Sequence, residues 1–128
     1  MSLNMTVGAQ RPSVLVVDDE LNFVILLDRV LSKKGYQVKT AGNTEQALAL
    51  IRGHTTFDVA IVDIRMEPVD GLTLLVELKQ RLPHIKVIML TAYPTYETRM
   101  TSVQEGASAY FTKPVELGNL LHTVRQLS

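Results

Sequence analysis

Short apolar runs rich in β-branched residues recur along the chain, and each run stops abruptly at polar residues. Such runs predict the strands of a parallel sheet, because a strand that is buried on both faces needs no polar alternation. The pattern predicts five strands, at residues 14–17, 36–40, 59–62, 87–90 and 109–112.

The segments between these runs carry apolar residues at helical spacing. The first apolar stripe comprises Phe23, Leu26, Leu27, Val30 and Leu31. Gly35 follows this stripe, at a position where glycine commonly ends a helix. Asn43 and Asp70 are predicted to cap the second and third helices, which should end near Gly53 and Pro83.

The fourth predicted helix, at about residues 95–105, is more polar than the others. The last apolar stripe comprises Leu117, Leu120, Leu121 and Val124. Strand and helix thus alternate five times, which implies parallel strands, right-handed crossovers and helices on both faces of the sheet. The predicted fold is α/β: a flavodoxin-like three-layer αβα sandwich with a five-stranded parallel sheet and (βα)5 topology.

The chain has 128 residues, which suits one domain, and its 13 basic residues balance 13 acidic ones. Nothing in this balance indicates a basic surface for nucleic acid, and no apolar run is long enough to span a membrane. The absence of cysteine fits a reducing cytoplasm, where we expect the protein to act. We expect residues 1–12 to be a disordered or cloning-derived segment and residues 13–128 to form the domain.

Polar side chains directly follow four of the predicted strands. They are Asp18, Asp19, Asp63, Thr91 and Lys113. Ligands of open parallel α/β sheets bind outside the carboxyl ends of the strands. We therefore expect these residues to bring three carboxylates, one hydroxyl and one ammonium group to the same edge of the sheet.

This set of groups suits phosphoryl chemistry. Two carboxylates about 4 Å apart repel each other by up to about 4 kcal/mol at an effective dielectric constant near 20, and a hard cation such as Mg²⁺ relieves that repulsion. The cation also neutralises an incoming phosphoryl group, which Asp63 can accept as an aspartyl phosphate. Lys113 and the hydroxyl of Thr91 are suited to bind phosphate oxygens.

Each of these residues, taken alone, also has an ordinary structural interpretation. Asp18 or Asp19 would cap the first helix, and Asp63 would be a solvated turn residue. The Thr91 hydroxyl would satisfy nearby backbone, and Lys113 would be a solvated charge. Their joint occurrence at the one edge where ligand sites form favours a shared site.

Four motifs occur in order along the chain. They are Val14–Glu20, Val62–Met66 with Asp70–Leu72, Leu90–Ala92 and Phe111–Pro114. Together they resemble the receiver domains of two-component response regulators, such as the chemotaxis response regulator and the receivers of transcriptional regulators, over about residues 13–127. The resemblance implies a signalling switch rather than an enzyme, although such a domain catalyses its own phosphorylation and dephosphorylation.

The resemblance also implies the ligands of the site. Asp63 is the phosphoacceptor, which takes its phosphoryl group from a sensor histidine kinase or a histidine phosphotransfer protein. Asp18, Asp19 and Asp63 bind Mg²⁺ as the cofactor, Asp18 through a water molecule. The backbone carbonyl of Arg65 supplies a further metal ligand, which leaves the identity of that side chain free to vary.

The remaining roles that the resemblance implies concern catalysis and switching. Lys113 contacts the phosphate and precedes Pro114 in a cis peptide bond, an option specific to proline. Thr91 moves toward the phosphate, and Tyr110, at the aromatic switch position, turns into the space that Thr91 leaves.

This movement reshapes the face formed by the fourth helix, fifth strand and fifth helix. An output domain or effector protein would read the change there, and a homodimer through the same face is compatible with the resemblance. Arg65 and Tyr93 occupy positions that tune the lifetime of the phosphoryl group in this family.

Three alternatives differ from this interpretation. Haloacid-dehalogenase-type phosphatases need an Asp-x-Asp motif after the first strand, whereas Asp18 and Asp19 are adjacent. A flavodoxin-like cofactor protein needs a phosphate-binding loop where this chain has three consecutive acidic residues. A phosphorylation-independent scaffold on the same fold is the main alternative, although such proteins typically lose an acidic residue or the lysine.

Overall fold

The computed structural model of the chain describes residues 11–53, 56–67 and 69–128. Five strands form one sheet: β1 (Ser13–Val17), β2 (Gln37–Ala41), β3 (Val59–Asp63), β4 (Lys86–Thr91) and β5 (Ala109–Thr112). The helices that follow them are α1 (Leu21–Lys33), α2 (Thr44–Gly53), α3 (Gly71–Arg81), α4 (Tyr96–Gln104) and α5 (Leu117–Leu127). The predicted alternation of strand and helix is confirmed.

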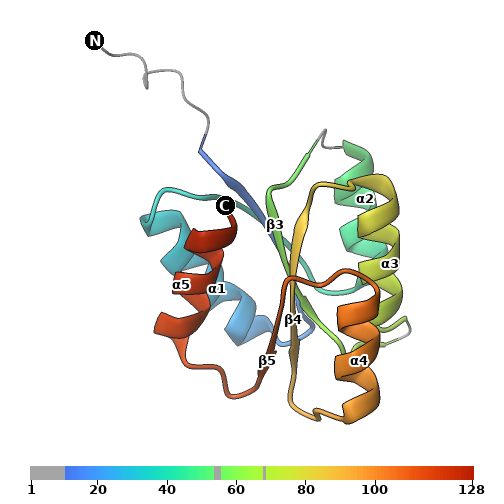
Figure 1. Cartoon of the computed structure of the whole chain (residues 1–128). Helices are drawn as coiled ribbons and strands as arrows, with labels where there is room; N and C mark the ends of the chain where they lie inside the picture. Colours follow the sequence, from blue (N-terminus) through green and yellow to red (C-terminus); the bar gives the residue numbers. More distant parts are fainter. Residues whose placement is uncertain (1–10, 54–55, 68) are drawn as a thin grey trace.

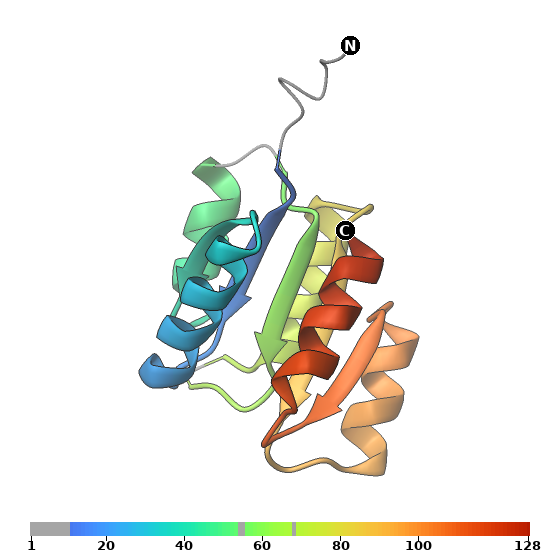
Figure 2. The same ribbon diagram turned by 90° about the vertical axis from the view of Figure 1, so that its left-hand side faces the viewer.

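All strands of the sheet are parallel, in the order β2-β1-β3-β4-β5. The strand order reverses between β1 and β3, which places the topological switch point there. Figures 1 and 2 show α1 and α5 on one face of the sheet and α2, α3 and α4 on the other. The predicted flavodoxin-like three-layer fold is therefore confirmed.

Strand β1 contributes to the apolar core on both faces of the sheet. Leu15 and Val17 pack with buried residues of α2 and α3, while Val14 and Val16 pack with those of α1 and α5. All four side chains are at most 1% exposed. Full burial of such a side chain stabilises the fold by about 1.5–3 kcal/mol, which accounts for the purely apolar residues of this run.

Local signals define the helix ends where the sequence predicts them. Asp70 caps α3, because its carboxylate accepts a hydrogen bond from the Thr73 N–H at 3.1 Å. The Asn43 side chain does the same for α2 by accepting from the Gln46 N–H at 2.8 Å. Gly35 follows α1 with a φ of 96°, a conformation that a side chain would strain.

The predicted boundaries differ from the observed ones by small amounts. The strand predicted at residues 36–40 lies one residue later, and Gly53 is the last residue of α2 rather than its successor. Residues 1–10 of the predicted N-terminal segment lie outside the described residues. The carbonyl of Pro12 accepts a hydrogen bond from the Gln37 N–H at 2.9 Å. Among the described residues, no helix combines the length and apolarity needed to cross a membrane.

Candidate functional site

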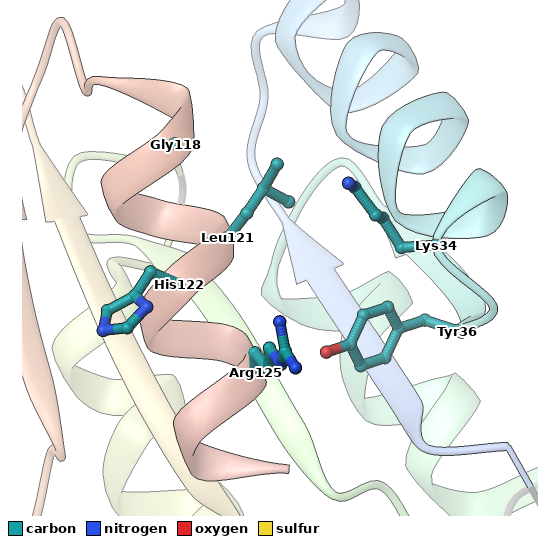
Figure 3. A pocket seen from close by; sticks show the side chains of 6 residues that line it. All are labelled: Lys34, Tyr36, Gly118, Leu121, His122 and Arg125. Carbon is teal, nitrogen blue, oxygen red and sulfur yellow. The ribbon is translucent and has the colours of Figure 1, made fainter.

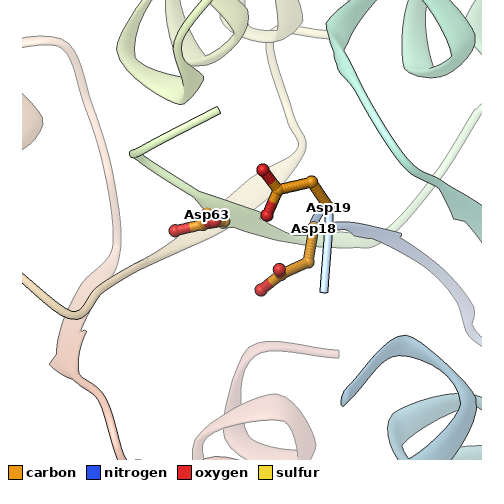
Figure 4. Close-up of side chains that lie close together, drawn as sticks. All are labelled: Asp18, Asp19 and Asp63. Atoms are coloured by element: carbon orange, nitrogen blue, oxygen red, sulfur yellow. The ribbon is translucent and has the colours of Figure 1, made fainter. Parts of the chain in front are cut away.

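The three predicted aspartates lie together at the carboxyl ends of β1 and β3 (Figure 4). Asp18 and Asp19 directly follow β1, and Asp63 is the last residue of β3, the strand beside it. One oxygen atom of each carboxylate lies within 4.8 Å of the others. Asp18 and Asp63 are buried, whereas Asp19 is exposed. The predicted meeting of these carboxylates at one edge is confirmed.

Burial and mutual repulsion oppose ionisation in this cluster. Burial, followed by the charge of Asp18, raises the pKa of Asp63 from 3.8 to about 6. Burial also raises the pKa of Asp18, against the hydrogen bond from Lys113. The Glu20 N–H donates to Asp18 Oδ1 at 2.9 Å, and the Arg65 N–H donates to Asp63 Oδ1 at 3.4 Å. Since these few donors leave the pKa values raised, a cation at the cluster would relieve unfavourable electrostatic energy.

Lys113 reaches the cluster from the loop after β5. Its Nζ donates to Asp18 Oδ2 at 2.7 Å and to Glu20 Oε1 at 3.2 Å. The same atom lies 3.9 Å from Asp63 Oδ2. Burial alone would lower the pKa of Lys113, but the hydrogen bond to Asp18 and the charge of that carboxylate outweigh it, so the pKa lies above its usual value. The Lys113–Pro114 peptide bond is cis, as the resemblance implies.

The two residues that the resemblance assigns to the switch are both bonded locally. Thr91 ends β4 and is fully buried, and its Oγ1 accepts a hydrogen bond from the Tyr93 N–H at 3.0 Å. Tyr110 is half-buried on β5, and its hydroxyl shares a hydrogen bond of 2.9 Å with Oγ1 of Thr98 in α4. Either residue must therefore exchange a hydrogen bond before it moves.

Gly71 allows α3 to start directly against the site. A Cβ atom at this position would collide with the backbone carbonyl of Asp63 and lie 2.9 Å from Val62 Cγ1. The Gly71 N–H donates to the Ile64 carbonyl at 2.8 Å, which closes the loop after β3. The missing side chain thus allows the close approach that positions the backbone of Asp63.

The family model of the response regulator receiver domain matches residues 14–125, a span that contains every predicted site residue. This chain belongs to that family. The predicted function is thereby confirmed at the level of the domain: the chain is a signalling receiver domain of a two-component response regulator.

Relatives of this receiver domain are found among transcriptional regulators and single receivers. The transcriptional regulatory protein ZraR of Escherichia coli is 36% identical over 113 residues, which are 88% of this chain and 25% of ZraR. A CheY-like receiver from Methanospirillum hungatei has a TM-score of 0.88 at 31% identity, over 91% of this chain and 93% of that one. TrrA of Thermotoga maritima, solved with Mg²⁺ and BeF, has a TM-score of 0.80 at 34% identity, over 91% and 99% of the chains.

The chain therefore spans about a quarter of ZraR. By contrast, the chain covers nearly the whole length of the Methanospirillum receiver and of TrrA.

The donor set of the receiver domain suits a divalent cation. Asp18, Asp19 and Asp63 present hard oxygen ligands close to one another. Mg²⁺ prefers one or two carboxylates together with water molecules, and the exposure of Asp19 gives solvent access to the cluster. The described residues thus form a group that could hold a metal ion, whereas the role of the Arg65 carbonyl stays a prediction.

A second concave region of the receiver domain has a different chemistry. A hollow of about 460 Å³ lies between α5 and the segment that follows α1 (Figure 3). Its lining among the described residues comprises Lys34, Tyr36, Gly118, Leu121, His122 and Arg125. These residues include no carboxylate and none of the predicted site residues, so the hollow offers no carboxylate ligand for Mg²⁺ and no aspartate to accept a phosphoryl group.

Sequence reasoning gave no role to three residues that shape the receiver site. Glu20 binds Lys113, and the ring of Phe23 lies 5.0 Å from the same ammonium group. Gly71 allows α3 to approach Asp63. Glycine is a poor helix former, so its presence where the third helix is predicted is a signal for Gly71, and Glu20 extends the acidic pair. Nothing in the local pattern distinguishes Phe23 from an ordinary core residue.

Proposed function

We propose that Asp63 accepts a phosphoryl group from a phosphohistidine on a sensor histidine kinase or a histidine phosphotransfer protein. The observation that carries this proposal is the convergence of Lys113, Asp18 and Asp19 on one nearly buried carboxylate. A carboxylate oxygen of Asp63 forms the new O–P bond while the P–N bond of the donor breaks. The leaving imidazole keeps the electron pair of that bond.

The other groups of the site stabilise this transfer. Asp18, Asp19 and Asp63, together with the Arg65 carbonyl, would hold Mg²⁺, which would neutralise the phosphoryl charge when bound. Lys113 binds a phosphate oxygen as a point charge. Asp63 attacks in its ionised form, and the neighbouring cations favour that form against burial, which raises its pKa to about 6.

The phosphorylated domain acts as a switch rather than as an enzyme toward other substrates. The Thr91 hydroxyl gives up the hydrogen bond from the Tyr93 N–H and donates instead to a phosphate oxygen. Tyr110 gives up its hydrogen bond with Thr98 and turns to a more buried position. The packing of α4 supports this proposal. The structure describes all residues of α4, and Ser102 is the one that is buried, so few packing contacts oppose a rearrangement of the helix.

The face formed by α4, β5 and α5 transmits the signal to an output domain, an effector protein or a second copy of the chain. Tyr96 and Val103 of α4 are 78% and 59% exposed and give this face apolar surface for such a contact. The similarity to ZraR supports an output in transcription, which a DNA-binding part outside this receiver would carry out. The receiver acts in the cytoplasm, where sensor kinases present their phosphohistidine.

Intact-mass measurement after incubation with acetyl phosphate and Mg²⁺ tests this proposal. We expect the wild type and Asp28→Asn, a control that removes a carboxylate on α1, to gain the mass of one phosphoryl group. Asp63→Asn should gain nothing, and the wild type should gain nothing without Mg²⁺. Absence of the adduct together with failure to bind beryllofluoride would favour the phosphorylation-independent scaffold.

A further inference from the structure

Lys113 lies on the α1 side of the acidic cluster rather than beside Asp63. Its Nζ donates hydrogen bonds to Asp18 at 2.7 Å and to Glu20 at 3.2 Å. The separation of 3.9 Å from Asp63 Oδ2 is too long for a hydrogen bond. The ring of Phe23, 5.0 Å from Nζ, attracts the ammonium group toward the same side. The lysine therefore has other partners in the unphosphorylated chain.

The two carboxylates that bind Lys113 differ in exposure. The side chain of Asp18 is 1% exposed, so it cannot lose its partner without leaving a buried charge unpaired. The side chain of Glu20 is 65% exposed and is hydrated readily when the lysine leaves. An exchange of partners by Lys113 therefore releases Glu20 at a lower energetic cost than Asp18.

Helix capping does not account for the position of the Glu20 side chain. Glu20 is the N-cap residue of α1, yet its side chain makes no capping hydrogen bond. Glu116, the N-cap residue of α5, does accept a hydrogen bond from the Asn119 N–H. The carboxylate of Glu20 instead binds Lys113, a residue 93 positions away in the chain.

We propose that Glu20 is a positioning residue that keeps Lys113 bound away from Asp63 until Asp63 is phosphorylated. This inference rests on the proposed function. A phosphoryl group on Asp63 offers new anionic acceptors, and Lys113 exchanges the Glu20 carboxylate for a phosphate oxygen without any covalent step. Because Glu20 binds Lys113 only in the unphosphorylated state, it favours that state and opposes phosphorylation.

The affinity for beryllofluoride, an analogue of the phosphoryl group, tests this role at saturating Mg²⁺. Saturation is needed because the loss of an acidic charge also weakens Mg²⁺ binding. Glu20→Gln should bind beryllofluoride about two- to fivefold more tightly than the wild type, the range expected for an exposed ion pair. Glu45→Gln, which removes the same charge from the first turn of α2, should bind like the wild type. Equal or weaker binding by Glu20→Gln overturns the proposal.

Nuclear magnetic resonance of the Lys113 ammonium group gives a second readout. Glu20→Gln should shift this resonance in the free protein and leave it nearly unchanged in the complex with Mg²⁺ and beryllofluoride. A resonance that does not shift in the free protein overturns the contact itself. If the wild type binds no beryllofluoride, the proposed function fails and this inference with it. Normal wild-type binding without an effect of Glu20→Gln overturns only the role of Glu20.

Discussion

The guanidinium group of Arg65 lies over the ring of Tyr93, with Cζ 4.8 Å from the ring centroid. Arg65 is two residues after Asp63, and Tyr93 is two residues after Thr91. The contact therefore joins the loops that follow β3 and β4, on either side of the site. Both side chains are exposed, so the stack lies on the solvent side of these loops.

The first prediction is that this stack prolongs the life of the phosphoryl group by restricting the approach of water to Asp63. Arg65→Ala should accelerate hydrolysis about two- to fivefold, the effect of losing an exposed cation–π contact of about 0.5–1 kcal/mol. The measurement is the decay of the phosphorylated mass after acetyl phosphate has been removed. Arg29→Ala, an exposed arginine on α1, is the matched control, and equal decay of the two variants would contradict the prediction.

The raised pKa of Asp63 predicts that this carboxylate destabilises the fold at neutral pH without Mg²⁺. The favourable contribution of protonated Asp63 to the free energy of unfolding is fully present below the ordinary pKa of 3.8 and is lost as pH rises through about 6. Asp63→Asn should therefore raise the free energy of unfolding at neutral pH by roughly 1–3 kcal/mol, given a shift of about two pKa units. Urea unfolding at several pH values measures this gain, which should vanish below pH 3.8. A gain that persists unchanged in acid would have another cause.

Mg²⁺ is predicted to reverse the shift of the Asp63 pKa. A divalent cation beside the carboxylate favours its ionised form, so the pKa should fall well below about 6 when Mg²⁺ is added. Carbon-13 resonance of the carboxyl group reports the midpoint, and chelation of Mg²⁺ should restore it. Asp19→Asn should need more Mg²⁺ for the same shift. A midpoint that is insensitive to Mg²⁺ would show that these carboxylates do not bind the cation.

Gly71 is predicted to be intolerant of any side chain. Gly71→Ala would drive Cβ into the Asp63 carbonyl, and displacement of α3 should lower the free energy of unfolding by about 1–3 kcal/mol. Gly53→Ala is the matched control, because a Cβ there meets nothing within 4 Å and should be neutral or slightly stabilising. Urea unfolding of both variants decides the matter, and equal stabilities would mean that α3 accommodates the methyl group freely.

The secondary-structure elements, and the edge of the sheet at which the site forms, follow from the amino-acid sequence alone. The runs at residues 14–17 of β1 and 59–62 of β3 carry no polar residue because their side chains are buried on both faces, and this pattern is visible locally. Asp70 and Gly35 mark helix ends through contacts within a few residues. Since parallel strands end at the same edge, residues that follow them were expected to meet, as Asp18 and Asp63 do.

Which side chains bind one another at that edge depends on the tertiary structure. Lys113 binds Glu20 across 93 positions, and Arg65 stacks on Tyr93 from a different loop. No periodicity or capping rule encodes such pairs, because they depend on strand order, on the distance between loops and on burial. Burial likewise sets the raised pKa of Asp63, a property of the folded environment rather than of the motif.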